Sequence, residues 1–381
     1  MSRSHNQKTG FVTLLFLSTI LIASFTLTPY SGFASTGDNN NTSSQPEASQ
    51  DMASSSTTNA TTTNNNATSL NVQDIPIQKI NVGDIDIAYK VFGQGDPILL
   101  ISGSGAVMDQ WDPTILRDLS SNHTVIIFDH RGVGNTTAGT KPFSMIQFAN
   151  DTAGLLDALN IQKADVLGYS MGSFVAQELA ILHPEKLNRL ILYAASCGGE
   201  QAIPESPDVA QILSDVANNR LQDITKFLSV IFPQSWIQSH PNNLALPQSN
   251  EIVPPDTAIQ QDNVVKEWFA TNWSGVCSEL SKVTVPTLLV AGTEDVAVPA
   301  NNSLIIAQKI PGAWLVQFRE AGHGLMYQYP EQLSTVLQTF LTTTTQASNA
   351  TSTAPATAGT GTNTTTTTTT ATPTLNSTLT S

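Results

Sequence analysis

The chain has 381 residues, of which 12% are charged, and a formal net charge of −14 at pH 7. Nucleic acids and anionic membrane surfaces bind Lys- and Arg-rich patches, so this charge disfavours both as partners. An acidic surface favours solubility and says little about a substrate.

The start of the chain predicts export from the cell. Basic residues precede an apolar stretch from Phe11 to about Leu27, and Gly32-Phe33-Ala34 forms a small-x-small site. This order is typical of a signal peptide over residues 1–34, and it predicts a secreted or extracellular protein. An uncleaved anchor at the cell surface is the alternative. The apolar run is slightly short for a spanning helix, which favours cleavage and no stable membrane insertion beyond the leader.

Two segments of low complexity surround the rest of the chain. Residues 35–70 and 342–381 are rich in Ser, Thr and Asn, with few large apolar side chains. Such segments cannot bury a core, so we expect a disordered linker and a disordered Thr-rich tail around one domain at 71–341. Both contain Asn-x-Ser/Thr sequons, which are candidate glycosylation sites in an exported protein; this composition also creates them by chance.

Strand-like and helix-like segments alternate within the domain. A hairpin is predicted at Ile80–Phe92, with its turn at Gly83-Asp84. Further strands are predicted at 97–101, 124–128, 164–169, 190–195, 287–292 and 313–318, and helices at 110–120, 144–159, 174–183 and from about 330. This alternation predicts an α/β fold with a mostly parallel sheet between two layers of helices. Ligands bind at the carboxyl ends of the strands in such sheets.

The most informative motif is the pentapeptide GYSMG at 168–172. It lies between a strand-like run and a helix-like run, and G-x-S-x-G in that place is the nucleophile elbow of serine hydrolases. Its glycines permit close backbone approach, so Ser170 can be held on a strained turn with its hydroxyl exposed. A serine in a Gly-rich turn is otherwise only a turn residue; the flanking strand and helix favour a nucleophile.

An acid and a histidine follow in the chain order that this motif requires. Asp295 follows one predicted strand and His323 follows the next. Asp295 has a second interpretation as a helix N-cap, and Glu294 is its nearest rival as the acid. His323 alone among six histidines lies on a loop after a strand and downstream of the acid. We therefore predict Ser170, His323 and Asp295 as nucleophile, base and orienting acid.

With these residues in place, residues 71–341 resemble the α/β-hydrolase fold, most closely its esterase, cofactor-free haloperoxidase and proline-iminopeptidase-like branch. The motifs that carry the resemblance, besides the elbow, are LLISGSG at 99–105, DHRGVGN at 129–135 and HPEK at 183–186. Two positions depart from the family. Ser102-Gly103 replaces the usual His-Gly of the oxyanion loop, so the usual imidazole support of that loop is missing. Ser173 replaces a second glycine after the elbow.

The resemblance implies acyl transfer through a covalent intermediate. Ser170 attacks a carbonyl group while His323 takes its proton, and Asp295 orients the imidazole. The backbone N–H groups of Met171 and Ser104 match the two oxyanion donors of the family. A serine at the elbow argues against an epoxide hydrolase or a dehalogenase, in which an Asp stands there.

A long segment at about 198–280 interrupts the alternation of strands and helices, and it is too long for an ordinary connection. Its aromatic residues favour a helical cap over the active site. Candidate pocket residues are Trp111, Trp236 and Trp268, with burial in the core as the alternative. Near the ends of the segment lie Cys197 and Cys277, which form a disulfide in an exported protein or remain two buried thiols. Their spacing fits no metal site.

Together these features predict a secreted, carboxylesterase-like serine hydrolase for a small to medium lipophilic ester, lactone or amide. We expect a small-molecule substrate and neither a metal nor a cofactor. The alternatives are a cofactor-free haloperoxidase or perhydrolase, an aminopeptidase-like hydrolase, and a non-catalytic binding protein of the same fold. The sequence leaves the oligomeric state open.

Overall fold

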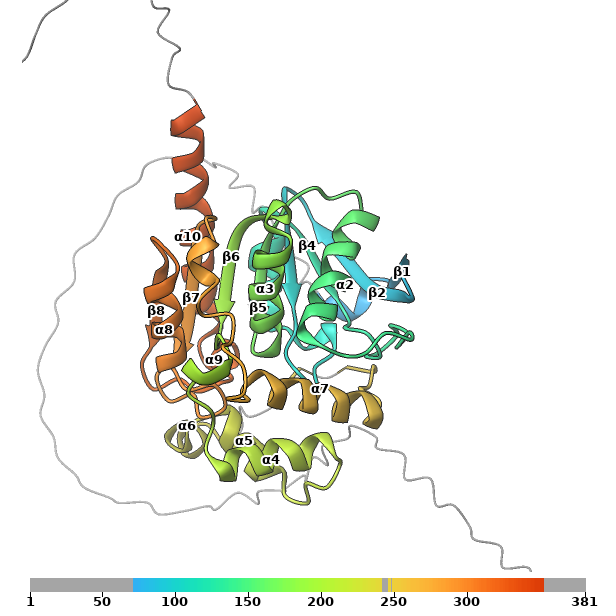
Figure 1. The fold of residues 1–381 in the computed structure, drawn as a ribbon, viewed down its shortest axis with the longest axis vertical. Helices are drawn as coiled ribbons and strands as arrows, with labels where there is room; N and C mark the ends of the chain where they lie inside the picture. The colour runs from blue at the N-terminus through green and yellow to red at the C-terminus, as the bar shows by residue number, and fades with distance from the viewer. Residues whose placement is uncertain (1–70, 242–245, 248, 353–381) are drawn as a thin grey trace, which may run out of the picture.

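The computed structural model describes residues 71–241, 246–247 and 249–352 of the chain. They form a sheet with helices on both faces and a further group of helices beyond one end of the strands (Figure 1). The predicted signal peptide, the linker and the tail after Ser352 lie outside the described residues.

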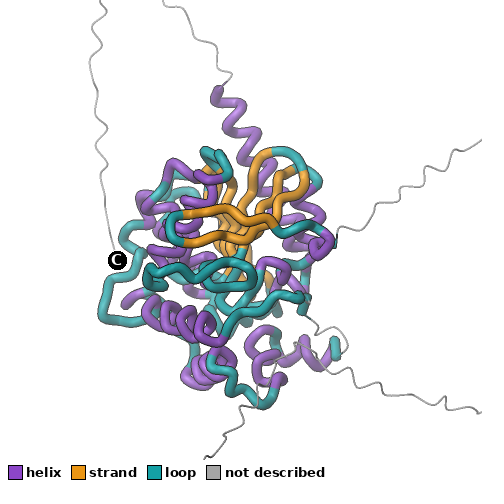
Figure 2. The backbone as a smooth tube through the Cα atoms, turned by 90° about the vertical axis from the view of Figure 1, so that its right-hand side faces the viewer, coloured by secondary structure: helices purple, strands orange, loops and turns teal. Residues whose placement is uncertain are grey.

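The centre of the fold is an eight-stranded sheet in the order β1-β2-β4-β3-β5-β6-β7-β8. The strands are β1 Gln78–Val82, β2 Ile85–Gly93, β3 Asp96–Ile101, β4 His123–Phe128, β5 Ala164–Tyr169, β6 Leu187–Tyr193, β7 Thr287–Gly292 and β8 Trp314–Phe318. The β1-β2 and β2-β4 pairs are antiparallel and all others are parallel, which confirms the predicted mostly parallel sheet. Figure 2 views the molecule from the side of the β1-β2 hairpin, which turns at Gly83-Asp84 as predicted.

Helices cover the two faces of the sheet and divide the core in two. One face carries α2 Met145–Ala158, α3 Met171–Leu182 and α8 Asn301–Lys309, and the other α1 Pro113–Ser120, α9 Leu325–Gln328 and α10 Pro330–Ser352. Along β3, Leu99 and Ile101 pack on the first face while Ile98 and Leu100 pack on the second. A strand buried on both faces is a continuous apolar run, which explains why β3 was recognisable in the sequence.

The strand order reverses around β3, because β4 lies on one side of it and β5 on the other. In open α/β sheets, the carboxyl ends of the strands at such a reversal are the usual ligand site. Here they carry the loop after Ile101 and the turn at Ser170. The topology thus places two of the predicted site segments next to each other.

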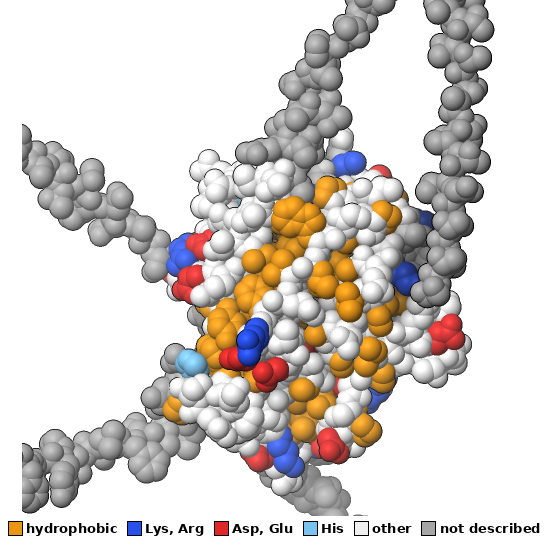
Figure 3. All heavy atoms as spheres, turned by 90° about the vertical axis from the view of Figure 1, so that its left-hand side faces the viewer, with side chains coloured by type: hydrophobic (Ala, Val, Ile, Leu, Met, Phe, Trp, Pro, Cys, Tyr) orange, Lys and Arg blue, Asp and Glu red, His pale blue; other side chains and the backbone are white. Residues whose placement is uncertain are grey.

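The sheet is less completely covered at its β8 edge than at its centre. β5 is buried along nearly its whole length, whereas Trp314 on β8 is 40% exposed and Leu304 on α8 is 43% exposed. Figure 3 views the molecule from the side of α8 and β8, and apolar side chains form a band across it.

The last helix corrects a predicted boundary. A disordered tail was expected from Thr342, but α10 continues from Pro330 to Ser352 and projects beyond the body of the domain (Figure 1). A helix that is already nucleated extends at little cost even through residues of moderate helix propensity, such as Thr and Ser. Low apolar content therefore did not mark the end of the helix.

The described part of the segment predicted as a cap forms four α-helices beyond the carboxyl ends of the strands (Figure 1). They are α4 Pro207–Ala217, α5 Ile224–Ile231, α6 Gln234–Ser239 and α7 Pro255–Trp268. A disulfide joins Cys197 to Cys277, with their Cα atoms 5.1 Å apart and both side chains buried. Of the two states that the sequence left open, the structure has the bridged one. It ties together the two ends of the cap where they leave the sheet.

Loss of this disulfide is expected to destabilise the protein. A Cys197→Ser/Cys277→Ser double variant removes a cross-link between residues 80 positions apart. Such a loss typically lowers the free energy of unfolding by about 2–4 kcal/mol, because the unfolded chain regains conformational freedom. Urea denaturation measures the effect, and wild-type protein denatured with a reductant should match the double variant. Equal stability of oxidised, reduced and double-variant protein would contradict this expectation.

Candidate active site

Ser170 occupies a sharp turn between β5 and α3, with φ 54° and ψ −124°. That φ is left-handed, which is unfavourable for a residue other than glycine and is found mainly where function requires it. The flanking glycines are sterically required: a Cβ on Gly172 would collide with the backbone of Ile101, and one on Gly168 with the backbone of Gly172. The pentapeptide thus has the geometry that its sequence predicted.

The structure brings Ser170, His323 and Asp295 into one hydrogen-bonded chain. His323 Nε2 lies 3.0 Å from Ser170 Oγ, and His323 Nδ1 lies 2.8 Å from Asp295 Oδ2. His323 is 6% exposed and Asp295 is 5% exposed, so water scarcely competes for these contacts. With the Nδ1 proton donated to the carboxylate, Nε2 is free to accept the hydroxyl proton of Ser170.

Both oxygens of Asp295 are used. While Oδ2 binds the histidine, Oδ1 accepts the backbone N–H groups of Ala297 (2.9 Å) and Val298 (2.8 Å). Asp295 is therefore not the N-cap of a helix, because α8 begins only at Asn301. Its carboxylate instead caps the turn that follows it. Glu294, its rival in the sequence, is exposed.

Two tyrosines, one buried and one half-buried, hold the backbone of His323, a feature that the sequence analysis missed. Tyr169 and Tyr193 both donate their hydroxyls to the carbonyl oxygen of His323, at 3.2 and 2.7 Å. Burial raises the pKa of both hydroxyls, so they remain protonated donors. They stand at the ends of adjacent strands, β5 and β6, and this position is the one sequence signal that could have identified them.

The loop after β3 packs directly against the serine. A Cβ on Gly103 would lie 3.2 Å from Ser170 Cβ, and Gly103 and Ser104 line the same cavity as Ser170. Met171 is the first residue of α3, where helix geometry leaves the N–H without an intrahelical partner. Both predicted oxyanion donors therefore belong to segments that border Ser170.

His130 supports this loop where the family histidine is missing. Its Nε2 lies 3.1 Å from the carbonyl oxygen of Ser102, and burial lowers its pKa, so the neutral ring donates one N–H there. Next to it, Asp129 Oδ1 accepts the N–H of Met108 at 2.7 Å. The DHRGVGN segment was recognised as a motif, but its role in holding the oxyanion loop was not.

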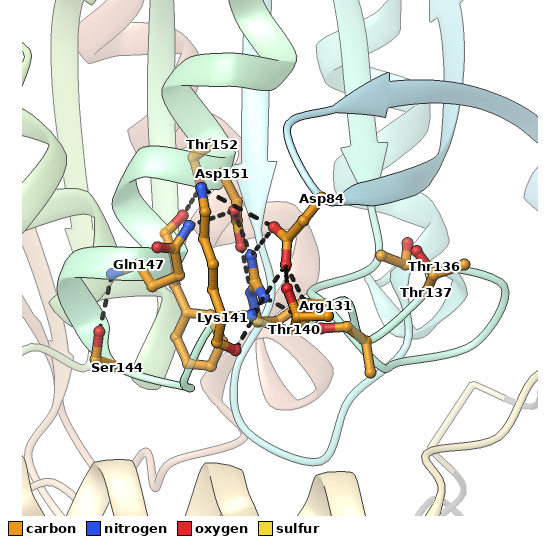
Figure 4. A network of polar contacts seen from close by, with 12 residues as sticks. Asp84, Arg131, Thr136, Thr137, Thr140, Lys141, Ser144, Gln147, Asp151 and Thr152 are labelled. Carbon is orange, nitrogen blue, oxygen red and sulfur yellow. Dashed lines mark hydrogen bonds and ion pairs between the residues drawn. The ribbon is translucent and has the colours of Figure 1, made fainter.

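Arg131 anchors that same segment to the body of the domain (Figure 4). It is buried and binds Asp151 through two parallel contacts, Nε to Oδ2 at 2.7 Å and Nη2 to Oδ1 at 2.8 Å. Asp84 completes the network with Arg131 and with the backbone N–H groups of Thr140 and Lys141, which lower its pKa. Such bidentate pairs fix orientation as well as distance.

A pair of carboxyl groups joins this segment to the cap. Asp129 Oδ2 and Glu251 Oε2 both approach the point beside Gly134 where a Cβ would lie, and the two side chains share a hydrogen bond. Burial first, and then repulsion from Glu251, raise the pKa of Asp129 to about 8. Asp129 therefore keeps its proton at neutral pH in the folded state.

This proton gives stability a pH dependence that a single substitution should remove. Folded Asp129 binds a proton that the unfolded chain releases above its ordinary pKa of 3.8, so its contribution to stability is complete below that pH. The contribution is lost as the pH rises toward about 8. In Asp129→Asn, the amide oxygen still accepts the Met108 N–H, and the amide NH₂ group donates to Glu251 at every pH.

The free energy of unfolding, measured by urea denaturation, should therefore rise in the variant relative to the wild type between pH 5 and pH 8. An equal difference between the two proteins at both pH values would contradict this.

Ser170 and His323 open into a cavity of about 400 Å³ between the sheet and the cap. Most of its wall is apolar, and the cap contributes Leu213, Val216, Phe227, Val265 and Phe269. Three charged side chains, Glu205, Asp262 and Lys266, also line it. The cavity can hold a small to medium ligand whose surface is mostly apolar.

The tryptophans predicted for the pocket do not line this cavity. Trp268 stacks on Phe174 and donates its indole N–H to Ser196, so it fastens the cap to α3. Trp111 is buried behind Tyr169, and Trp236 stacks on His240. Their large rings serve packing between elements, which was the alternative interpretation. This prediction is corrected in favour of Phe227 and Phe269.

Comparison with known families agrees with this geometry. The model of the alpha/beta hydrolase fold family matches residues 96–330, more than half of the chain. The chain belongs to the α/β-hydrolase fold family.

This α/β-hydrolase has relatives with several names. A putative carbamate hydrolase of Azorhizobium caulinodans is 28% identical, with 68% of this chain and 96% of the relative covered. A putative non-heme bromoperoxidase of Mycobacterium tuberculosis is 27% identical over 68% of this chain and 98% of the relative. The solved structure of an alpha/beta hydrolase fold protein from Chitinophaga pinensis has a TM-score of 0.61 and 26% identity, covering 71% and 99% of the two chains.

Two further findings concern the described residues of this α/β-hydrolase alone. None of their helices is both long enough and apolar enough to span a membrane. Nor do they contain a cluster of three or more His, Cys, Asp or Glu side chains arranged to hold a metal ion.

Proposed function

We propose that this α/β-hydrolase is a serine hydrolase of small to medium lipophilic esters, with lactones and amides as related substrates. The observation that carries the proposal is the chain of contacts from Ser170 through His323 to Asp295 beside a largely apolar cavity. The apolar wall suits the hydrophobic part of a substrate, and the polar groups at Ser170 suit its carbonyl group.

In the first step Ser170 Oγ attacks the substrate carbonyl and its proton passes to His323 Nε2. The imidazolium that forms is stabilised by Asp295, to which Nδ1 already points. Asp295 cannot rotate away, because Ala297 and Val298 hold its other oxygen. The two tyrosine hydroxyls on the His323 carbonyl keep the base in line with the serine.

The attack places a negative charge on the former carbonyl oxygen. The backbone N–H groups of Met171 and Ser104 stabilise that charge, and the partly positive N-terminus of α3 adds to the effect. His323 then gives its proton to the leaving group, and an acyl group remains on Ser170. Water, activated by the same histidine, releases the acid and restores the serine.

The names of the relatives bear on the type of reaction, and the disulfide bears on the localisation of the protein. The name carbamate hydrolase fits attack on a carbonyl group, and the name bromoperoxidase supports formation of a peracid as the second candidate activity. We also propose that the protein is secreted, which the Cys197–Cys277 disulfide supports because disulfides persist in oxidising compartments.

A substrate panel tests the proposal. Purified protein is assayed on p-nitrophenyl esters of increasing acyl length, on lactones, and on aminoacyl arylamides, with peracid formation from acetate and peroxide as a further arm. We expect ester hydrolysis to be the fastest of these reactions. Faster peracid formation would favour the second candidate, and faster arylamide cleavage would favour a peptidase. Inactivity on every arm would count against an enzyme.

A further inference from the structure

Four side chains hold the loop that carries Ser104. Three belong to the sheet side of the molecule: His130 binds the Ser102 carbonyl, Asp129 accepts from Met108, and Gln110 accepts from Val107 at 3.0 Å. The fourth comes from the cap, where Gln261 Oε1 on α7 accepts the N–H of Gly105 at 2.8 Å. Gln261 thus joins the cap to the residue directly after Ser104.

The loop has little stiffness of its own at this point. Ser104 lies between two glycines, and Gly105 has φ +71° with open space where a side chain would be. Glycine loses more conformational freedom than other residues on ordering, so a fixed position needs an external contact. The bond from Gln261 fixes the peptide between Ser104 and Gly105, which limits how far the Ser104 N–H can turn.

A glutamine at position 261 costs folding free energy, because part of its amide group is buried without a hydrogen-bond partner among the described residues. Its side chain is fully buried, and its Nε2 has no hydrogen-bond partner among the described residues. The amide cannot flip to relieve this, because the donor at Gly105 requires an oxygen opposite it. An apolar side chain would satisfy the packing of α7 without leaving a buried donor unpaired. The bond to Gly105 therefore accounts for a polar residue here.

We propose that Gln261 is a positioning residue that makes the oxyanion hole dependent on the cap: the seated α7 holds the peptide after Ser104, so that the Ser104 N–H faces the developing oxyanion. The inference rests on the proposed serine-hydrolase function and adds to it the residue through which the cap acts. On α7, Gln261 is surrounded by residues that line the cavity: Ala258, Asp262 and Val265. A substrate that fills the cavity therefore contacts the helix that carries Gln261.

The test compares Gln261→Met with Gln260→Met, a control that makes the same change at the exposed neighbouring position of α7. Methionine matches glutamine in length but cannot accept the Gly105 N–H. We expect Gln261→Met to lower kcat about 10- to 100-fold, the loss that a misplaced rather than missing oxyanion donor should cause, with KM nearly unchanged. Binding of a boronic acid, which mimics the tetrahedral oxyanion, should weaken by the same factor. Gln260→Met should match the wild type on both readouts.

Gln261→Glu supplies a second readout in case the methionine variant folds poorly. A neutral carboxyl group at this position resembles the amide, whereas a carboxylate places negative charge near the oxyanion. The kcat of this variant relative to wild type should therefore fall as the pH rises. A purely structural role would give a constant ratio.

The proposal is overturned if Gln261→Met keeps kcat and boronic acid affinity within twofold of Gln260→Met, or if the Gln261→Glu ratio does not change with pH. These outcomes differ from a failure of the proposed function, in which the wild type itself neither hydrolyses an ester nor binds the boronic acid. In that case both proposals are wrong.

Discussion

Ser170→Ala is expected to lower kcat for ester hydrolysis by about a million-fold. The hydroxyl is the only proposed nucleophile, and it lies 3.0 Å from the nitrogen that takes its proton. Nothing else in the described structure depends on this oxygen, so the fold and the cavity should be unchanged. Steady-state kinetics with a p-nitrophenyl ester and thermal unfolding measure the two effects.

Ser173→Ala is the matched control for this variant. Ser173 lies in the first turn of α3, and its hydroxyl donates to the backbone oxygen of Ser170 at 2.7 Å without lining the cavity. Its loss removes one neutral hydrogen bond, so the variant should keep at least about a tenth of wild-type kcat. Comparable losses in the two variants would mean that Ser170 acts through the shape of the turn and not as the nucleophile.

Asp295→Asn is expected to lower kcat by about ten-thousand-fold. The Asn oxygen can still accept from Ala297 and Val298, so the turn is kept. The Asn NH₂ group then faces His323 Nδ1, which must become an acceptor, and the proton moves to the nitrogen that should receive one from Ser170. The loss in rate should appear without a comparable loss of stability.

Two further variants distinguish a role of Asp295 in orienting His323 from a purely structural role in its turn. Asp295→Ala removes the turn contacts as well, so it should lower both kcat and the free energy of unfolding. Glu294→Gln alters the exposed neighbouring carboxylate and should leave both unchanged. If Glu294→Gln reduced kcat more than Asp295→Asn, the acid would have been assigned to the wrong residue.

The contrast between these residues shows what the sequence could predict. Ser170, Asp295 and His323 were found because each follows a strand, and because parallel strands bring their carboxyl ends to one edge of the sheet. The elbow was found because its glycines are a local steric requirement. Such information lies in a few neighbouring residues and in the order of elements, and both can be read from a single chain.

Contacts between distant elements were not predictable in the same way. Tyr193, His130 and Gln261 act on backbone groups that are 130, 28 and 156 positions away in the chain. Nothing local distinguishes them from a buried tyrosine, histidine or glutamine with a structural role. The cap tryptophans illustrate the same limit, since aromatic content predicted a cap but not which rings would face the cavity.

Covalent labelling tests the central claim most directly. The domain is incubated with a fluorophosphonate, and its intact mass is compared with that of a Ser170→Ala variant treated in parallel. We predict one adduct on the wild type and none on the variant, because only a hydroxyl activated by His323 and facing the oxyanion donors reacts readily. An unmodified wild-type protein that is folded and admits a small boronic acid to the cavity, or an equal adduct on the variant, would contradict the account.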